Sequence, residues 1–297
     1  MSWVNLGILL AWAVAIGLSA NRLTRADEPL SVLILDGVNP SHDWQVTTPL
    51  LQHLLRKSGR FRVDVATAPA EGEDMSGYRP RLADYDVVLS NYGDQRPWPE
   101  ALQADFVRYV EGGGGFVCYH AASNAFADWP EYNRICPLGG WYGRDVRWGP
   151  YAYFRDDKLV RDESPGVTGH HGPQHEYQVE MRDLEHPITR GMPPVWQHTK
   201  DELYDTLRGK AENLQVLASA YSDPAQEGTG RHEPLLVVQN YGKGRVFQTM
   251  LGHADYSMRC VGFITTLLRG TEWAASGKVT IPVPKDFPTA EATSSRE

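Results

Sequence analysis

The stretch GGGGFVCYHAAS, residues 112–123, decides the fold class of this chain. Four glycines close a helical pattern, an apolar run of strand length follows, and small residues surround a turn at His120. A strand that runs into a tight turn of small residues has the layout of the nucleophile elbow in α/β enzymes. Such a turn presents the side chain at its tip and points backbone N–H groups at whatever binds above it. A turn that only permits close packing is the structural alternative.

The segments before this stretch alternate between strand and helix patterns. The patterns predict strands in SVLILDG (31–37), FRVDVAT (61–67), DYDVVLSNYGD (84–94) and GFVCYH (115–120), and helices in TTPLLQHLLRKSG (47–59) and PEALQADFVRYVEGGGG (99–115). Nearly continuous apolar strands that alternate with helices are typical of a parallel sheet covered on both faces. We therefore predict a doubly wound, mostly parallel α/β sheet of the flavodoxin-like type.

The pattern changes after the fourth strand. Residues from Ala121 to about Gly172 lack regular periodicity and predict a long loop insertion. Strand patterns then return in YQVEM (177–181), LQVLASAY (214–221), PLLVVQNYG (234–242) and GRVFQTML (244–251), followed by a helical pattern over 256–276. YGKG (241–244) is a hairpin turn between two of these strands. The second half therefore adds antiparallel strands to the sheet.

Two terminal segments lie outside the predicted domain, which spans residues 31–283. An apolar run from Val4 to Ala20 leads to small residues at Thr24 and Ala26, so residues 1–26 predict a signal peptide and export to the periplasm or the extracellular space. Arginines follow this run instead of preceding it, which leaves an uncleaved N-terminal membrane anchor as the alternative. Polar residues 284–297 predict a disordered tail.

Composition restricts the class of ligand. The net charge of -8 excludes a nucleic-acid surface, because no stretch supplies the clustered Lys and Arg that phosphates require. A small neutral molecule fits better, and we expect no nucleotide cofactor and no membrane contact beyond the possible anchor. Aromatic side chains often line carbohydrate pockets, and Trp44 and Trp141 are the candidates for substrate binding.

Three cysteines are too few for a disulfide framework or a cysteine zinc site. In an oxidising compartment Cys136 and Cys260 are the favoured pair, and three buried free thiols are the alternative. Cys118 lies on a predicted buried strand, which argues against a role as nucleophile.

Three histidines follow predicted strands directly. His42 comes after the first strand, His120 ends the fourth and His253 follows the last. Ligands bind at the carboxyl ends of the strands in doubly wound sheets, so the fold would bring these side chains into one crevice. Each histidine alone is more often a hydrogen-bonded structural residue.

Several segments resemble the trehalose-utilisation (ThuA-like) family. They are SVLILDG with His42 and Trp44 after it, GGGGFVCYHAAS, HEYQVEMRDLEHPITRGMP, WQHTKDELYDTLRG and GTGRHEPLLVVQNYGKGRVFQTMLGH. The family fold is similar to class I glutamine amidotransferases, whose elbow reads Gly-x-Cys-x-Gly. Here the cysteine position holds His120, so the resemblance excludes glutamine hydrolysis through a thioester.

The resemblance implies a role with sugars, including oxidised (3-keto) sugars, and a divalent metal in some members. We predict His42, His120 and His253 as ligands of such a metal, zinc first, because neutral imidazoles with one carboxylate suit it. Glu202 in DELY is the candidate carboxylate, as ligand or general base, and His120 and Glu202 are the catalytic candidates. A helix N-terminal acid is the alternative for Glu202.

Further residues could face the same crevice. They are His175, Arg231 and His232, with Arg231 as a clamp for a hydroxyl or carboxylate. The leading hypothesis is metal-assisted hydrolysis, lyase cleavage or isomerisation of a sugar or keto-glycoside. A non-catalytic carbohydrate-binding or accessory protein is the alternative, and an amidase that uses Cys118 is a third.

Overall fold

The first strand shows why the molecule is layered. In the computed structural model, which describes residues 28–297, β1 (Leu30–Asp36) is buried along both faces. Val32 and Ile34 belong to one hydrophobic cluster, while Leu33 and Leu35 belong to another. Because successive side chains of a strand point to opposite faces, one apolar strand supplies two cores.

Five parallel strands form the centre of the sheet, in the order β2-β1-β3-β4-β11. Their remaining bounds are β2 (Phe61–Thr67), β3 (Val87–Ser90), β4 (Gly115–Tyr119) and β11 (Gly244–Thr249). In register, Gly115 of β4 pairs with Val87 on one side and Arg245 on the other. The order matches the flavodoxin-like pattern and confirms the predicted fold class.

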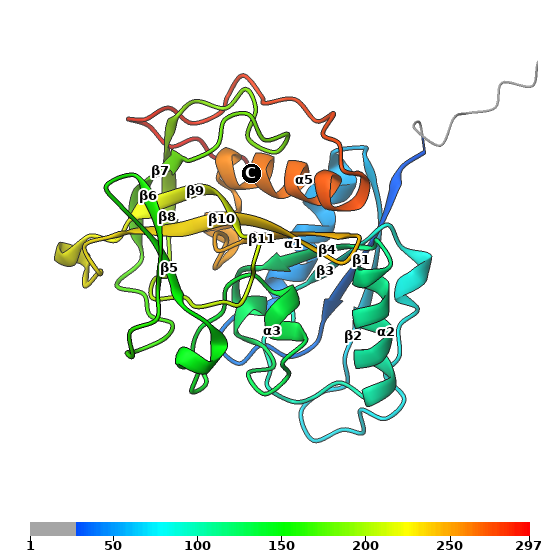
Figure 1. Cartoon of the computed structure of the whole chain (residues 1–297). Coiled ribbons are helices and arrows are strands. Elements are labelled where there is room, and N and C mark those ends of the chain that lie inside the picture. The colour runs from blue at the N-terminus through cyan, green and yellow to red at the C-terminus, as the bar shows by residue number, and fades with distance from the viewer. Residues whose placement is uncertain (1–27) are drawn as a thin grey trace, which may run out of the picture.

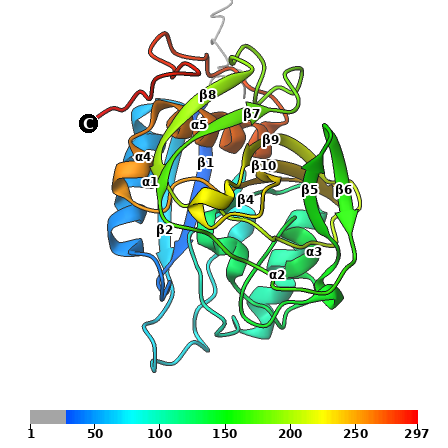
Figure 2. The same cartoon turned by 90° about the vertical axis from the view of Figure 1, so that its left-hand side faces the viewer.

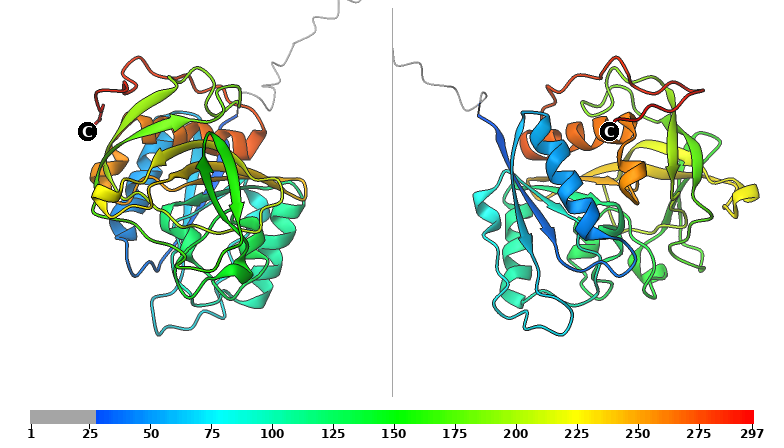
Figure 3. Two further views of the ribbon diagram at one scale, coloured as in Figure 1. Left: turned by 60° about the vertical axis from the view of Figure 1, so that its left-hand side comes forward. Right: turned by 180° about the vertical axis from the view of Figure 1, so that it is seen from behind.

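Helices cover both faces of this sheet, as Figure 1 shows with α5 on one side and α2 and α3 on the other. Long helices are α1 (Trp44–Lys57), α2 (Glu100–Glu111) and α5 (Val261–Ser276), and short ones are α3 (Tyr132–Ile135) and α4 (Asp255–Met258). The side chain of Asp43 accepts a hydrogen bond from the backbone N–H of Val46, which caps the start of α1. Figure 3 shows α1 and α5 together from behind.

Antiparallel strands extend the sheet beyond β11, in the order β10-β9-β7-β8. They are β7 (His175–Met181), β8 (Val195–Asp201), β9 (Gln215–Tyr221) and β10 (His232–Tyr241). The predicted turn at Tyr241–Gly244 joins β10 to β11 as an antiparallel hairpin. The polar-patterned strand β8 was missing from the sequence prediction.

The predicted loop insertion contains structure of its own. Its elements are the short helix α3, the strands β5 (Tyr151–Arg155) and β6 (Lys158–Asp162), and the 3₁₀ segments η2 (His120–Asn124) and η3 (Val146–Trp148). The other 3₁₀ segments are η1 (Leu82–Asp84) and η4 (Pro224–Gln226). β5 and β6 form a hairpin that reaches β10. Figure 2 shows it apart from the β7–β8 hairpin.

The C-terminal segment differs from the prediction of a disordered tail. The backbone N–H of Gln197 donates to the carbonyl of Thr289, and that of Val261 donates to the carbonyl of Ser294. The ring of Phe287 packs against Trp196, with centroids 5.6 Å apart. These contacts with β8 and α5 fix residues whose composition alone indicates disorder.

The predicted signal peptide or anchor, residues 1–26, lies outside the described residues. Within residues 28–297 we find no helix with the length and apolar character that crossing a bilayer requires.

This structure contains no bond between the three cysteines, and the favoured pairing of Cys136 with Cys260 is wrong for this fold. Cys260 lies in the hydrophobic cluster on one face of the sheet, whereas Cys136 lies in the cluster on the other face beside Cys118. The sheet separates the two thiols, so no side-chain rotation joins them.

Candidate metal centre

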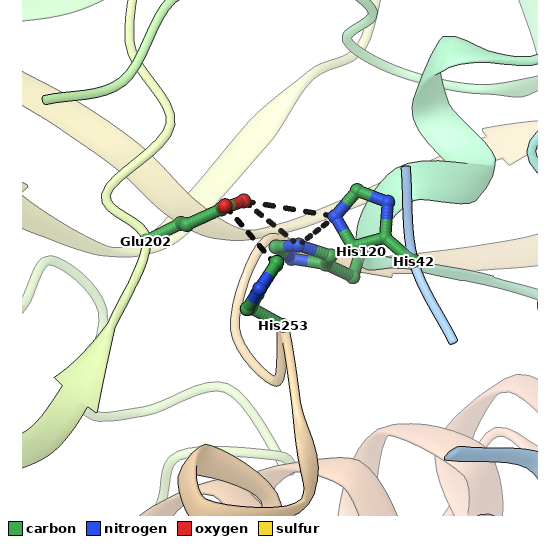
Figure 4. A group of neighbouring side chains, drawn as sticks. All are labelled: His42, His120, Glu202 and His253. Carbon is green, nitrogen blue, oxygen red and sulfur yellow. Dashed lines mark hydrogen bonds and ion pairs between the residues drawn. The ribbon is translucent and has the colours of Figure 1, made fainter. Parts of the chain in front are cut away.

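Four predicted residues meet at one edge of the sheet. His42 follows β1, His120 follows β4 and His253 follows β11. Because these strands are parallel, their carboxyl ends lie along the same edge and the histidines converge. Glu202 arrives from elsewhere, directly after the antiparallel strand β8. Figure 4 shows the four side chains pointing toward one another.

The distances within this group are short enough for one ion to bridge them. His42 Nε2 and His120 Nε2 are 3.0 Å apart. Glu202 Oε2 lies 3.4 Å from His120 Nε2 and 3.6 Å from His42 Nε2, and Glu202 Oε1 lies 3.1 Å from His253 Nδ1. One ligand atom from each residue can be chosen so that all lie within 4.8 Å of one another. Three imidazoles and one carboxylate are a donor set that suits zinc.

Hydrogen bonds at the Nδ1 atoms of His42 and His120 determine which nitrogen of each ring carries a lone pair. His120 Nδ1 lies 2.5 Å from the carbonyl oxygen of Met250, which can only accept, so Nδ1 carries the proton. His42 Nδ1 likewise donates to Asn39 Oδ1 at 3.2 Å. In the neutral rings both Nε2 atoms are therefore unprotonated, and they face each other across 3.0 Å. Two lone pairs at this distance repel unless a metal ion lies with them or one ring takes up a proton. The hydroxyl of Tyr204, 3.3 Å from His42 Nε2, is a neighbouring donor for that atom.

Two polar atoms of the group make close contacts without a hydrogen bond of good geometry. Glu202 Oε2 and His253 Nδ1 are buried and make no bond of good geometry with the rest of the described chain. Leaving buried polar atoms unsatisfied costs about 1–3 kcal/mol each. Coordination of a metal would satisfy both, so the residues present fit a bound cation.

The turn at His120 is strained as an elbow requires. His120 has φ of 43°, a left-handed conformation that is uncommon for residues other than glycine. The tip is not exposed as the sequence suggested, since only 1% of His120 is accessible. The ring of Tyr204 covers it, with centroids 4.4 Å apart.

Electrostatics favour neutral imidazole at His42 and an ionised carboxylate at Glu202. Burial, with the neighbouring charge of His120, lowers the pKa of His42 to about 4 although Glu202 opposes the shift. Burial raises the pKa of Glu202, but the contacts with the histidines outweigh it and hold that pKa well below its usual range. Burial lowers the pKa of His253, but the contact with Glu202 raises it by more, so the net shift of this pKa is upward. Metal binding must therefore displace a proton from His253 at low pH.

A buried carboxylate, Asp201, holds two of the four residues in place. Its oxygens accept the backbone N–H groups of Glu202 at 2.9 Å, His253 at 3.0 Å and Gly252 at 2.7 Å. The ring of His198 donates to it at 2.8 Å. Burial lowers the pKa of His198, but Cys260 and Asp201 raise it to about 9, so an ion pair forms inside the protein. One side chain thus ties the end of β8 to the loop after β11.

A cavity of about 310 Å³ lies beside the four residues. Its lining consists of Ser41, His42, Asn124, Trp141, Tyr142, His171, Glu202 and Tyr204. The predicted Trp141 is there, with its ring centroid 4.6 Å from that of Tyr204. Sequence reasoning missed Tyr204, His171 and Asn124, and only Tyr204 had a local signal, its place in the motif DELY.

One wall of this cavity is fixed by Arg144, which is 4% exposed. Its guanidinium donates to the carbonyls of Asn124 at 3.0 Å and Gly140 at 2.7 Å. Between Gly140 and Arg144, both Trp141 (φ 58°) and Tyr142 (φ 47°) are left-handed. Such conformations persist only where the surroundings impose them, and Arg144 supplies that restraint.

The other residues assigned to substrate binding do not line the cavity. They are Trp44, His175, Arg231 and His232. Trp44 opens α1, and His175 donates through Nδ1 to the carbonyl of Pro173. Arg231 is paired with Glu233 at 3.1 Å, and His232 lies 3.8 Å from Glu180. His175 and His232 open β7 and β10, whose starts lie at the same edge of the sheet as the ends of β8 and β11, yet their side chains do not reach the lining of this cavity.

The geometry excludes two alternatives, one for Glu202 and one for Cys118. Glu202 follows a strand, so it is not a helix N-terminal acid. Cys118 is fully buried, and burial raises the pKa of its thiol, which leaves it neither accessible nor ionised.

The fold and the site together define a glutamine amidotransferase-like α/β protein whose elbow carries a histidine. Residues 31–274 match the ThuA family, described as trehalose utilisation, and the chain belongs to this family. Membership supports a role in trehalose or sugar utilisation at the level of the family.

Two solved structures are similar over most of their length. A ThuA-like protein from Parabacteroides merdae is 49% identical, with a TM-score of 0.88 over 91% of this chain and 98% of its own. A ThuA-like protein from Bacteroides uniformis is 20% identical, with a TM-score of 0.58 over 87% of this chain and 96% of its own, and it shows the fold alone. None of the curated proteins matches the chain.

Proposed function

We propose that His42, His120, Glu202 and His253 bind a divalent metal, zinc first, and that the protein uses it on a sugar or keto-glycoside. One observation carries the metal proposal: two imidazole lone pairs face each other 3.0 Å apart beside a carboxylate. Family membership supports the sugar. The cavity beside the four residues, lined by aromatic and polar side chains, has a size that suits a small ligand.

When bound, the metal would act as a Lewis acid on a sugar carbonyl or a water molecule. The chain's own residues supply the rest. The rings of Trp141 and Tyr204 offer apolar surface for a sugar ring, while Asn124 and Ser41 offer polar groups to its hydroxyls. A keto group acidifies the neighbouring C–H, and Glu202, the carboxylate at the cavity wall, is the candidate to accept that proton. Hydrolysis, lyase cleavage and isomerisation of a keto-sugar share this requirement.

The test of the metal is elemental analysis of the purified protein beside variants of the site. We expect close to one divalent metal per chain in the wild type, and loss of it in His120→Ala and His253→Ala. His53→Ala, an exposed histidine of α1, is the matched control and should keep its metal. A wild type that folds but stays free of metal after reconstitution would overturn the proposal.

Metal loading should also depend on pH in a definite direction. Because Glu202 raises the pKa of His253, protons compete with the metal there as the pH falls. Zinc affinity measured by competition with a chelator should weaken on acidification. Affinity that stays constant between neutral and mildly acidic pH would contradict coordination by His253.

The enzyme is distinguished from a carbohydrate-binding protein by Glu202→Gln. An enzyme should lose turnover of a keto-sugar in this variant, whereas a binding protein has no turnover to lose. Affinity is measured by calorimetry together with the metal content, because Glu202 is also a candidate ligand. Affinity without turnover in the wild type would leave a binding protein as the function.

A further inference from the structure

We infer that Cys118 and Cys136 are a disulfide-forming pair that ties the elbow strand to the wall of the cavity. Their sulfur atoms lie 3.4 Å apart. Both are buried within the same hydrophobic cluster, on one face of the sheet. This is the only contact between cysteine sulfurs that the described part of the chain contains.

The geometry requires little movement. A disulfide bond is about 2.05 Å long, so the sulfurs need to approach by about 1.4 Å. Cys118 lies in β4 and Cys136 directly after α3, and the two elements already pack together through Phe116 and Tyr132. The third cysteine provides an internal comparison, because Cys260 lies on the opposite face of the sheet.

The bond forms by exchange with a small-molecule or protein disulfide of an oxidising compartment. The thiolate of Cys136 attacks one sulfur of that disulfide and releases one thiol, leaving a mixed disulfide. The thiolate of Cys118 then attacks the Cys136 sulfur and releases the second thiol. Two protons leave the protein, its two thiols are oxidised, and the external disulfide is reduced to two thiols.

The burial of both thiols determines when the disulfide can form. Cys118 is 0% exposed and Cys136 is 3% exposed, so no external disulfide reaches them in the folded protein. The reaction therefore takes place during folding, while both thiols are accessible. Once formed, the bond is shielded from reductants by the same burial. Export, which the N-terminal segment predicts, would supply the oxidising compartment.

The bond would bear on the candidate metal centre through the chain. Cys118 lies two residues before His120, and Cys136 begins the segment that leads to Trp141. A covalent link between them would hold the elbow and the aromatic wall of the cavity at a fixed separation. It would also reduce the conformational entropy of the unfolded chain.

The experiment refolds the full-length chain in a buffer of oxidised and reduced glutathione. Thiols are then alkylated in denaturant and counted by intact mass, with and without prior reduction. We expect one alkylated cysteine before reduction and three after, since the chain has three cysteines. Peptide mapping should place the free thiol at Cys260 and find the peptides of Cys118 and Cys136 linked.

Two cysteine variants show which thiols form the bond. Cys260→Ala should still form the bond, whereas Cys118→Ala should leave both remaining thiols free. Reduction should lower the thermal midpoint of the wild type and of Cys260→Ala, and leave that of Cys118→Ala unchanged. Three free thiols in the correctly folded wild type, or a bond that includes Cys260, would overturn the inference.

Discussion

Replacing Asp201 by Asn should damage both the stability and the metal centre. The carboxylate accepts three backbone N–H groups and the ring of His198, and it is fully buried. Asparagine keeps one accepting oxygen but turns its NH₂ group toward groups that also donate. It also removes the carboxylate that, together with Cys260, holds the pKa of His198 at about 9 in the native protein.

The size of the effect follows from these contacts. Removing one partner of a buried ion pair costs about 3–5 kcal/mol. At about 2–4 °C per kcal/mol for a chain of this size, the thermal midpoint should fall by roughly 6–20 °C. Outer hydrogen-bond partners of metal ligands change metal affinity by about 10–100-fold, and Asp201 positions two candidate ligands.

Urea unfolding followed by circular dichroism measures the first effect, and zinc competition with a chelator measures the second. The matched control is Asp286→Asn, because Asp286 pairs with Arg296 at 2.6 Å on the surface, where the side chains are 51% and 42% exposed. Such a pair contributes at most about 1 kcal/mol. If Asp201→Asn unfolds at the same urea concentration as Asp286→Asn and binds zinc like the wild type, the positioning role is refuted.

Two further predictions concern stability. The folded pKa of His198, about 9, exceeds the ordinary value of 6.5, so its stabilising contribution is complete below pH 6.5 and is lost as the pH rises through 9. Urea midpoints measured across this window should decline in the wild type and decline less in Asp201→Asn; parallel slopes would contradict the assignment. Gly262→Ala should destabilise the protein by about 1–3 kcal/mol, because a Cβ there would lie 2.3 Å from the buried ring of Trp196. Calorimetric melting can compare Gly262→Ala with Gly77→Ala, where a Cβ meets nothing within 4 Å. Equal thermal midpoints would show that the Trp196 ring moves aside without cost.

Much of the fold could be predicted because its signals are local. The strand at residues 61–67 has the predicted bounds, and β1 and β4 differ from prediction by one or two residues. A parallel strand buried on both faces is nearly all apolar, so it stands out in the sequence. β8 was missed because VWQHTKD, with two charged residues, alternates too weakly to indicate a strand.

Some residues of the candidate site could be predicted from local signals and others could not. His42, His120 and His253 were predictable, since each follows a parallel strand and the topology alone aligns such ends. The positions of His175, Arg231 and His232 depend on antiparallel strands, whose direction alternates, so their place relative to the crevice could not be deduced.

The sequence by itself determined the doubly wound sheet, the elbow at His120 and the histidines at one edge, because helix and strand periodicity and strand direction are properties of the local chain. The family resemblance named Glu202 as the candidate carboxylate, but only the tertiary structure decided that Glu202 completes the group and that Asp201 holds it there. Glu202 is separated in sequence by 82 residues from His120 and by 51 residues from His253. No periodicity reports a contact over such distances. The contact of Glu202 with the histidines is set by how the β7–β8 hairpin packs on the rest of the protein.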